Sequence, residues 1–293
     1  MRVGMTLPVM EPDLNAGVLE RWCRTIDEGP FSSLCFGERM AFDNPEALTL
    51  LGAVAAWTER VRIVLTVVVP QLHDPVMLAK ALATGDALSR GRLTVGLGVG
   101  GREEDYRAVG ADLATRTMAH LADTASVLRR VWAGEVYGGA VLPVGPRPAQ
   151  PGGPPLLVGT MGPKTVRSAA SWAQGLAGVF MAPEPDPALF DLARSSWAEA
   201  DRPAPLLATS TWFALDDGDG SARRQVHQHL RHYMNWLPPG LVDALAATTG
   251  FAGTLDQLAV LLRRVEDLGA DELHLIPTSS DLSQVERVAS LLT

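Results

Sequence analysis

Two charged side chains and a histidine follow two apolar segments of the sequence that are long enough to be strands. Glu38 and Arg39 come directly after residues 32–36, and His73 follows residues 62–69. A carboxylate and an imidazole can transfer protons, whereas a guanidinium stays charged and can hold an anion. We therefore predict catalytic roles for Glu38, Arg39 and His73. The alternatives are an ion pair between Glu38 and Arg39, and a hydrogen bond from His73 at a helix start.

A segment rich in glycine and threonine, residues 159–165, has the composition of a phosphate cradle. Free backbone N–H groups at a helix start, the positive end of the helix dipole, hydroxyl groups and one lysine all favour a bound anion. Because no complete P-loop signature is present, an ordinary helix start at the Gly-Pro step is the alternative. The predicted cofactor-binding residues of this segment are Gly159, Thr160, Met161, Gly162, Lys164 and Thr165.

Gly96, Gly98 and Gly101 match the spacing G-x-G-x-x-G after an apolar segment. That pattern is typical of dinucleotide sites, but here it follows the fourth predicted strand and not the first. We interpret the glycines as positions where a planar ring approaches the backbone without meeting a Cβ atom, with Gly98 as the predicted contact. A tight turn after the strand would account for the same glycines. An NAD-dependent dehydrogenase on an open sheet is a further alternative.

The remaining histidines and cysteines predict no second kind of site. His227, His229 and His232 stand near arginines, but at helical spacing three imidazoles do not converge on one point. We interpret them as part of a solvated helix face, and we predict no metal site. Cys23 and Cys35 are too few for a disulfide framework or a thiolate cluster, so we expect both to be reduced packing residues.

Eight apolar segments of strand length alternate with helical patterns. Residues 62–69 are the clearest, because they show no polar alternation and many β-branched side chains, as in a parallel strand covered on both faces. A capping side chain before a proline predicts helix starts at residues 44–45 and 74–75. Thr254 and Gln257 predict a capping box. The expected strands are residues 2–7, 32–36, 62–69, 93–98, 155–158, 177–181, 206–213 and 272–276.

Eight strand-then-helix units favour a closed parallel barrel, and 293 residues exceed the ~250 that such a barrel needs. We therefore predict the α/β class and a single TIM-type (β/α)8 barrel over residues 1–293, with an open doubly wound sheet as the alternative. Residues 134–154 are rich in glycine and proline and predict a loop insertion, either a lid, a binding loop or a tolerated surface insertion. In a barrel of this kind the active site lies at the carboxyl ends of the strands.

The charge and hydropathy of the chain exclude several partners. A formal net charge of −8 opposes nucleic acid and anionic membrane surfaces, because binding to both depends on clustered lysine and arginine. No apolar run approaches the ~20 residues of a spanning helix, and the segment after Met1 resembles a strand and not a charged leader. We predict a cytoplasmic protein that acts on a small molecule, without nucleic-acid or membrane partners.

The segment from His73 to Gly100 resembles the hallmark region of the bacterial luciferase-like monooxygenase family. The resemblance rests on His73-Asp74-Pro75, Leu88-Ser89-Arg90-Gly91-Arg92 and Gly96-Leu97-Gly98-Val99-Gly100. Supporting matches, which extend it over nearly the whole chain, are Ser33 with Gly37-Glu38, residues 154–159, and Gly253-Thr254 with residues 268–271.

The resemblance implies a barrel that binds FMN or the deazaflavin coenzyme F420, its ring stacked in the barrel mouth, in a homodimer formed through outer helices. It places the cofactor phosphate near residues 159–165. It also implies a cis peptide at the end of the third strand, near Val68 and Val69, that supports the ring; a cis Val69–Pro70 bond is the alternative. Arg39 departs from the family pattern, which often has a histidine here, and this puts histidine acid catalysis at that position in doubt.

The function that the resemblance implies is hydride transfer or monooxygenation of a small organic substrate with F420 or reduced FMN. The compact chain and the segment Gly37-Glu38-Arg39 look more like the F420 branch. A noncatalytic barrel subunit that binds a partner or ligand without a redox ring is a second alternative.

Overall fold

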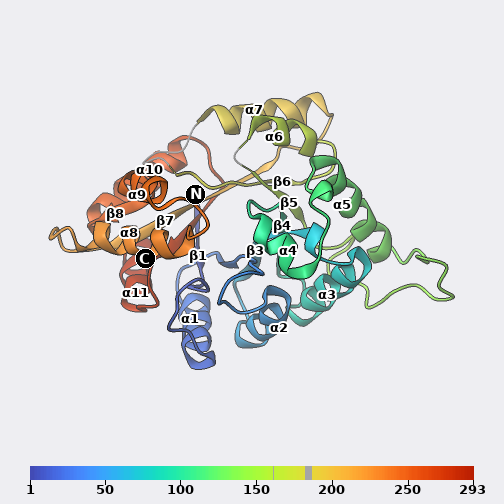
Figure 1. Cartoon of the computed structure of the whole chain (residues 1–293), viewed down its shortest axis with the longest axis horizontal. Helices are drawn as coiled ribbons and strands as arrows, with labels where there is room; N and C mark the ends of the chain where they lie inside the picture. The colour runs from blue at the N-terminus through green and yellow to red at the C-terminus, as the bar shows by residue number, and fades with distance from the viewer. Residues whose placement is uncertain (161, 182–186) are drawn as a thin grey trace.

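Nine parallel strands and the helices between them form the chain, as the computed structural model shows for residues 1–160, 162–181 and 187–293 (Figure 1). The strands are β1 (Arg2–Thr6), β2 (Ser33–Phe36), β3 (Arg62–Val68), β4 (Leu93–Leu97), β5 (Leu156–Gly159), β6 (Gly175–Ala177), β7 (Leu206–Leu215), β8 (Phe251–Gly253) and β9 (Glu272–Pro277).

Eight of these strands close into a ring in the order β1-β2-β3-β4-β5-β6-β7-β9. The pairing of Gly175 with Leu206 joins β6 to β7, and the pairing of Arg2 with Glu272 joins β1 to β9. The predicted TIM-type barrel is therefore confirmed, and the open-sheet alternative is wrong. The short strand β8, which the sequence did not predict, pairs with the far end of β7 outside the ring.

The helices surround the ring (Figure 1), and the largest core cluster lies between their inner faces and the strands. No helix in the described part of the chain is both long and apolar enough to cross a membrane. The helices are α1 (Ala16–Glu28), α2 (Ala47–Trp57), α3 (Pro75–Leu88), α4 (Glu103–Val109), α5 (Met118–Trp132), α6 (Pro163–Ala169), α7 (Pro187–Glu199), α8 (Ser221–Tyr233), α9 (Pro239–Thr248), α10 (Leu255–Asp267) and α11 (Ser283–Leu292), with the short 3₁₀ helices η1 (Pro70–Leu72) and η2 (Leu113–Thr115).

Two of the three predicted helix starts are confirmed. Asp74 caps α3, and Thr254 opens α10 with a complete capping box. The predicted start at Asn44 is wrong, because α2 begins at Ala47. There the carboxylate of Glu46 accepts two N–H groups of the first turn and replaces the expected cap.

The predicted sixth strand is misplaced. β6 ends at Ala177, so residues 178–181 lie outside it. These residues nevertheless run beside β7, because Gly178 and Phe180 donate N–H groups to carbonyl oxygens of β7 at 2.9 and 3.0 Å. These residues are apolar because they are buried beside β7. A sequence pattern does not distinguish such a segment, which bonds to one neighbouring strand, from a strand that pairs along both edges.

The loop over residues 134–154 joins the end of α5 to the start of β5, and Figure 1 shows it projecting beside α3 and α5. Lys80 Nζ donates to the Gly145 carbonyl at 2.6 Å, and the Gln150 side chain donates to Asp86 at 2.7 Å. The loop therefore lies at the amino ends of the strands. No residue of it lines the cavity described below, and its role as a lid, a binding loop or a surface insertion stays a prediction.

The interior of the ring holds a polar cluster where barrels of this type usually carry branched aliphatic side chains. The Glu272 carboxylate accepts hydrogen bonds from Ser32 and Ser33 at 2.6 and 2.7 Å and pairs with Arg62. His274 Nε2 lies 3.6 Å from the same carboxylate, and both side chains are buried. The Glu272 carboxylate, paired with Arg62, therefore lies inside the ring toward the amino end of β9.

The charges of this cluster stabilise one another. Although burial alone would raise it, hydrogen bonding with His274 and the charges of His274 and Arg62 hold the pKa of Glu272 well below its usual value. Although burial alone would lower it, Cys35 and Glu272 raise the pKa of His274 from 6.5 to about 10. We therefore expect His274 to carry a positive charge at neutral pH.

Replacing His274 by glutamine should lower the free energy of unfolding by about 3 kcal/mol, because it removes one partner of a buried ion pair. A group whose folded-state pKa is raised stabilises the fold fully below its unfolded pKa, and this stabilisation is lost as pH rises through the folded pKa. Between pH 6.5 and 10, urea denaturation should therefore show a steeper loss of stability in the wild type than in His274→Gln.

The partly exposed His227 provides the matched control, since His227→Gln should leave the pH dependence of stability as it is in the wild type. Equal slopes in the wild type and in His274→Gln would show that His274 is not a buried cation.

Candidate active site

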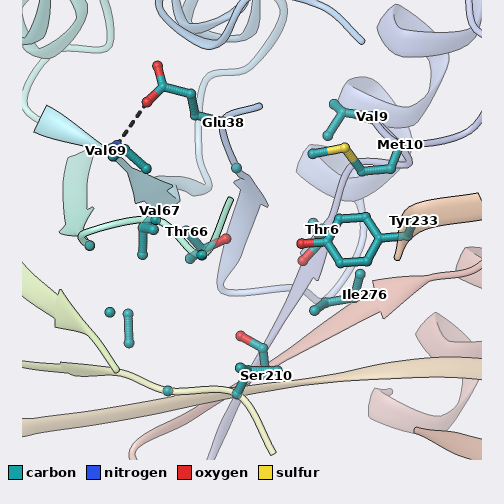
Figure 2. Close-up of a pocket in the computed structure, with 18 of the residues that line it drawn as sticks. Thr6, Val9, Met10, Glu38, Thr66, Val67, Val69, Ser210, Tyr233 and Ile276 are labelled. Carbon is teal, nitrogen blue, oxygen red and sulfur yellow. Dashed lines mark hydrogen bonds between the residues drawn. The ribbon is translucent and has the colours of Figure 1, made fainter. Parts of the chain in front are cut away.

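A cavity of about 460 Å³ opens at the carboxyl end of the barrel, within the ~300–1,000 Å³ typical of ligand and cofactor sites. Residues at or just after the ends of seven ring strands line it, together with Ser210 and Trp212 from within β7. Figure 2 shows apolar side chains such as Met10 and Val67 facing hydroxyl groups of Thr6 and Ser210. The Thr6 hydroxyl is buried and has no hydrogen-bond partner among the described residues. The cavity thus combines apolar walls with unpaired polar atoms.

One wall of the cavity is built by an irregularity in β3. The register of β3 against β4 shifts between Leu65 and Val68. In a regular strand, successive side chains point to opposite faces. Here the consecutive residues Thr66 and Val67 both line the cavity (Figure 2).

The peptide bond between Thr66 and Val67 is cis. The prediction of a cis bond near Val68 and Val69 is therefore correct in kind and wrong in position, and the Val69–Pro70 alternative is also wrong. The irregularity lies inside the strand, which resumes pairing with β4 at Val68. A continuous run of β-branched residues gives no signal for such an internal break.

Glycines of three neighbouring strands make room for this part of β3. A Cβ atom on Gly159 would lie 2.4 Å from Val67 Cγ1, and one on Gly98 would lie 2.8 Å from Val67 Cγ2. A Cβ atom on Gly37 would lie 2.7 Å from the Thr66 carbonyl oxygen. Packing against the protein's own β3 segment therefore requires glycine at these positions, and the contact of Gly98 with a bound ring stays a prediction. Gly98 and Gly159 still line the cavity.

Glu38 lines the cavity and is fully engaged by its neighbours. Its Oε2 accepts the Val69 N–H at 2.8 Å, shown as the dashed line in Figure 2, and its Oε1 lies 2.7 Å from His73 Nε2. Although burial alone would lower it, Glu38 raises the pKa of His73. His73 does not line the cavity and contacts the site through Glu38. The alternative of an ion pair between Glu38 and Arg39 is wrong, because Glu38 contacts His73 and Arg39 pairs with Asp105.

Arg39 pairs with Asp105 instead. Its Nε lies 3.3 Å from Asp105 Oδ2, and its guanidinium carbon lies 4.5 Å from the ring centre of Phe42. Arg102 lines the cavity with its guanidinium carbon 3.8 Å from the ring centre of Trp236. Burial and the neighbouring charge of Arg102 lower the pKa of Arg39. Arg39 pairs with Asp105, and Arg102 lies over the ring of Trp236 without an ion pair to that carboxylate, so the two guanidinium groups beside the cavity favour an anionic group there.

His229 is a cavity residue that the sequence interpretation missed. The prediction of a solvated face fits His232, which is exposed, but it is wrong for His229, which is buried and lines the cavity. Its Nδ1 hydrogen-bonds with the Glu11 carboxylate. The available signal was its spacing, since His229 lies three residues after Val226 and four before Tyr233, on the inner stripe of α8.

The remaining predicted cofactor residues divide by position. Val69, Thr160 and Thr165 line the cavity, while Val68 packs in the core outside the ring. Thr160 Oγ1 accepts the Gly162 N–H at 2.9 Å, which shapes the segment before α6. Gly162 and Lys164 are outside the cavity lining, and Lys164 is exposed. Met161 lies outside the described residues.

These features define a (β/α)8 barrel with an apolar cavity at the carboxyl ends of its strands. The chain belongs to the luciferase-like monooxygenase family, whose family model matches residues 1–273.

Sequence relatives within this family include proteins of different activity. An uncharacterized protein of Mycobacterium tuberculosis is 36% identical over 134 residues, which are 42% of this chain and 47% of the relative. An F420-dependent glucose-6-phosphate dehydrogenase of Nakamurella multipartita is 31% identical over 143 residues, 45% of this chain and 41% of the relative. The pyrimidine monooxygenase RutA of Pantoea ananatis is 32% identical over 103 residues, 33% and 28% of the two chains. The chain therefore spans less than half the length of these relatives.

Solved structures share the whole fold. A monooxygenase of Streptomyces bottropensis has a TM-score of 0.77 at 22% identity, covering 99% of this chain and 97% of the other. An F420-dependent secondary alcohol dehydrogenase in complex with an F420-acetone adduct has a TM-score of 0.77 at 16% identity, covering 100% of both. The oxygenating constituent of 3,6-diketocamphane monooxygenase of Pseudomonas putida, in complex with FMN, has a TM-score of 0.75 at 16% identity, covering 100% and 96%. At these identities the likeness establishes the fold.

Replacing Gly159 by alanine should lower the free energy of unfolding by about 1–3 kcal/mol, because the new Cβ overlaps Val67 Cγ1 in a packed site. Removing the obstructing methyl groups with Val67→Ala should recover most of that loss in the double variant. Chemical denaturation of the wild type, both single variants and the double variant measures this coupling.

Gly52 is the matched control, because a Cβ there meets no atom within 4 Å and the residue lies within α2. Gly52→Ala should leave stability unchanged or raise it by up to about 1 kcal/mol. Strictly additive effects of Gly159→Ala and Val67→Ala would contradict the contact between them.

Proposed function

We propose that this protein is an oxidoreductase that uses F420 or reduced FMN for hydride transfer or monooxygenation of a small organic substrate. The carrying observation is the cavity at the carboxyl end of the barrel, whose apolar walls surround unpaired polar atoms. A flat redox heterocycle has apolar faces and polar edges, so it matches both properties.

The residues that surround the cavity fit such a ring. Val67 and Val69 offer apolar surface on one wall, and Met10 offers it across the cavity (Figure 2). The buried, unpartnered Thr6 hydroxyl can bond a polar ring edge, which would relieve the cost of burying it without a partner. When bound, the ring would supply the two-electron chemistry, and the protein would supply binding and orientation.

We assign the anionic tail of the cofactor to the segment over residues 159–165. Thr160 and Thr165 bring hydroxyl groups to the cavity at the start of α6. The exposed Lys164 adds a positive charge nearby. These contacts support a phosphate at this end of the cavity.

Glu38 is the acidic group of the proposed site, and His73 positions it. Since His73 and the Val69 N–H hold both carboxylate oxygens, the side chain is fixed at the cavity wall. Arg39 and Arg102, with Asp105, give the adjacent wall its positive charge. Arg39 therefore contributes a charge and not a titratable imidazole at this position.

F420 is the favoured cofactor. The segment Gly37-Glu38-Arg39 resembles the F420 branch of the family, and relatives named as F420-dependent enzymes align over 45–50% of this chain. We also propose a cytoplasmic homodimer formed through outer helices.

The experiment that tests this function is a fluorescence titration of the purified apoprotein with F420, FMN and NAD in parallel. Saturable binding of F420 or FMN, with F420 tighter and NAD without effect, is the expected result. Binding of neither F420 nor FMN would refute the proposal and support the noncatalytic subunit.

Thr160→Ala should weaken cofactor binding about tenfold, because one hydroxyl hydrogen bond to an anion contributes about 1.4 kcal/mol or more. Thr160→Ser retains the hydroxyl and serves as the matched variant, so its dissociation constant should stay near that of the wild type. If Thr160→Ala and the wild type bind the cofactor with equal affinity, the assignment of the phosphate to this segment is wrong.

A further inference from the structure

We propose that Glu11 and His229 form a proton-transfer site on the cavity wall, which takes the oxygen atom of an alcohol or of the corresponding carbonyl compound. This inference deepens the proposed function and rests on it. The family pattern often has a histidine at the position of Arg39. Here the proton-transfer role falls instead to His229 of α8, on another part of the cavity wall.

The imidazole of His229 is held in one orientation. It is 5% exposed, its Nδ1 hydrogen-bonds with the Glu11 carboxylate, and its ring stacks on Tyr233 with centroids 5.9 Å apart. Glu11 comes from the loop after β1, so two separate parts of the chain fix the ring. Among the described residues, His229 Nε2 has no hydrogen-bond partner, although it is buried and its residue lines the cavity.

This arrangement selects a tautomer. A carboxylate only accepts hydrogen bonds, so Glu11 favours a proton on Nδ1 of the neutral ring and leaves a lone pair on Nε2. The same carboxylate stabilises the imidazolium that forms when Nε2 takes a proton, as in other carboxylate-imidazole pairs. A buried nitrogen without a partner is costly, and a substrate hydroxyl would satisfy it.

The other acidic and basic groups around the cavity are less available for proton transfer. Glu38 uses both oxygens, and Asp105 accepts from two backbone N–H groups while it pairs with Arg39. Arg39 and Arg102 remain protonated. Among the described charged and titratable groups, Glu38, Arg102, Asp105 and Tyr233 line the cavity with His229, while Glu11 contacts His229 and Arg39 contacts Asp105 from behind the lining.

The chemistry balances for oxidation of an alcohol by oxidised F420. The C–H bond breaks, and its hydrogen leaves with both electrons to the deazaflavin ring, which is reduced by two electrons. The O–H bond breaks, its proton passes to His229 Nε2, and the carbon–oxygen double bond forms. Solvent later takes the proton from His229. Carbonyl reduction runs through the same groups in reverse.

The tautomer is tested without turnover by long-range ¹H–¹⁵N NMR of the apoprotein labelled with ¹⁵N-histidine. We expect the neutral His229 ring to carry its proton on Nδ1, with the signal assigned by its absence in His229→Gln. Glu11→Ala should shift the proton toward Nε2. A neutral wild-type ring protonated on Nε2 would overturn the proposal.

Turnover is tested with the F420-loaded protein and the secondary alcohols propan-2-ol, butan-2-ol and cyclohexanol, by following F420 reduction. His229→Gln should lower kcat about 100-fold, leave F420 affinity unchanged and remove the rise in rate with pH. Added imidazole should restore part of the rate in His229→Gly, which a structural role would not allow. His227→Gln, on the same helix and paired with Asp243, should match the wild type.

The outcomes separate the two proposals. F420 binding without oxidation of any of the three alcohols, or a pH profile that His229→Gln leaves unchanged, would overturn this inference and leave the proposed function standing. Absence of F420 and FMN binding would overturn the proposed function itself.

Discussion

The site depends on one steric constraint: the ring of strands has to close around a β3 segment that directs two consecutive residues, Thr66 and Val67, into the cavity. The neighbouring strands meet this constraint with glycine, because a Cβ atom on Gly98 or Gly159 would fall within 2.8 Å of a Val67 methyl group. The same packing gives the cavity an apolar wall of fixed shape. A rigid wall of this kind is what a flat cofactor requires, since binding then costs little conformational entropy.

Buried polar groups lie at two levels of the barrel, inside the ring and at the cavity mouth. The cluster around Glu272 and His274 lies toward the amino end of β9, where Glu272 pairs with Arg62 and lies 3.6 Å from His274 Nε2. Neither nitrogen of the buried His274 ring has a hydrogen-bond partner among the described residues, and the same holds for the Thr6 hydroxyl and for His229 Nε2 at the mouth. The two groups at the mouth belong to residues that line the cavity, so a bound ligand can complete their hydrogen bonding.

The sequence was sufficient for the architecture because that information is periodic. Apolar runs such as residues 62–69 and capping residues such as Asp74 are local signals, and the structure confirms both elements. The errors concern tertiary geometry. The break inside β3, the ion pair that Arg39 makes with Asp105, and the burial of His229 all depend on residues distant in sequence. Of the predicted site, Glu38, Gly98 and Gly159 lie at the cavity, while His73 contacts Glu38 from outside the lining, and Gly162 and Lys164 lie outside it.

The central claim is that the flat ring of the cofactor lies against Val67, and methyl NMR tests it most directly. In a protein with ¹³C-labelled valine methyl groups, saturating F420 or FMN should shift both Val67 signals, because an aromatic ring in contact changes the local magnetic field. The exposed Val260 on α10, outside the cavity lining, should keep its signals unchanged. Val67 signals that stay in place while the cofactor is bound at saturation would contradict the account.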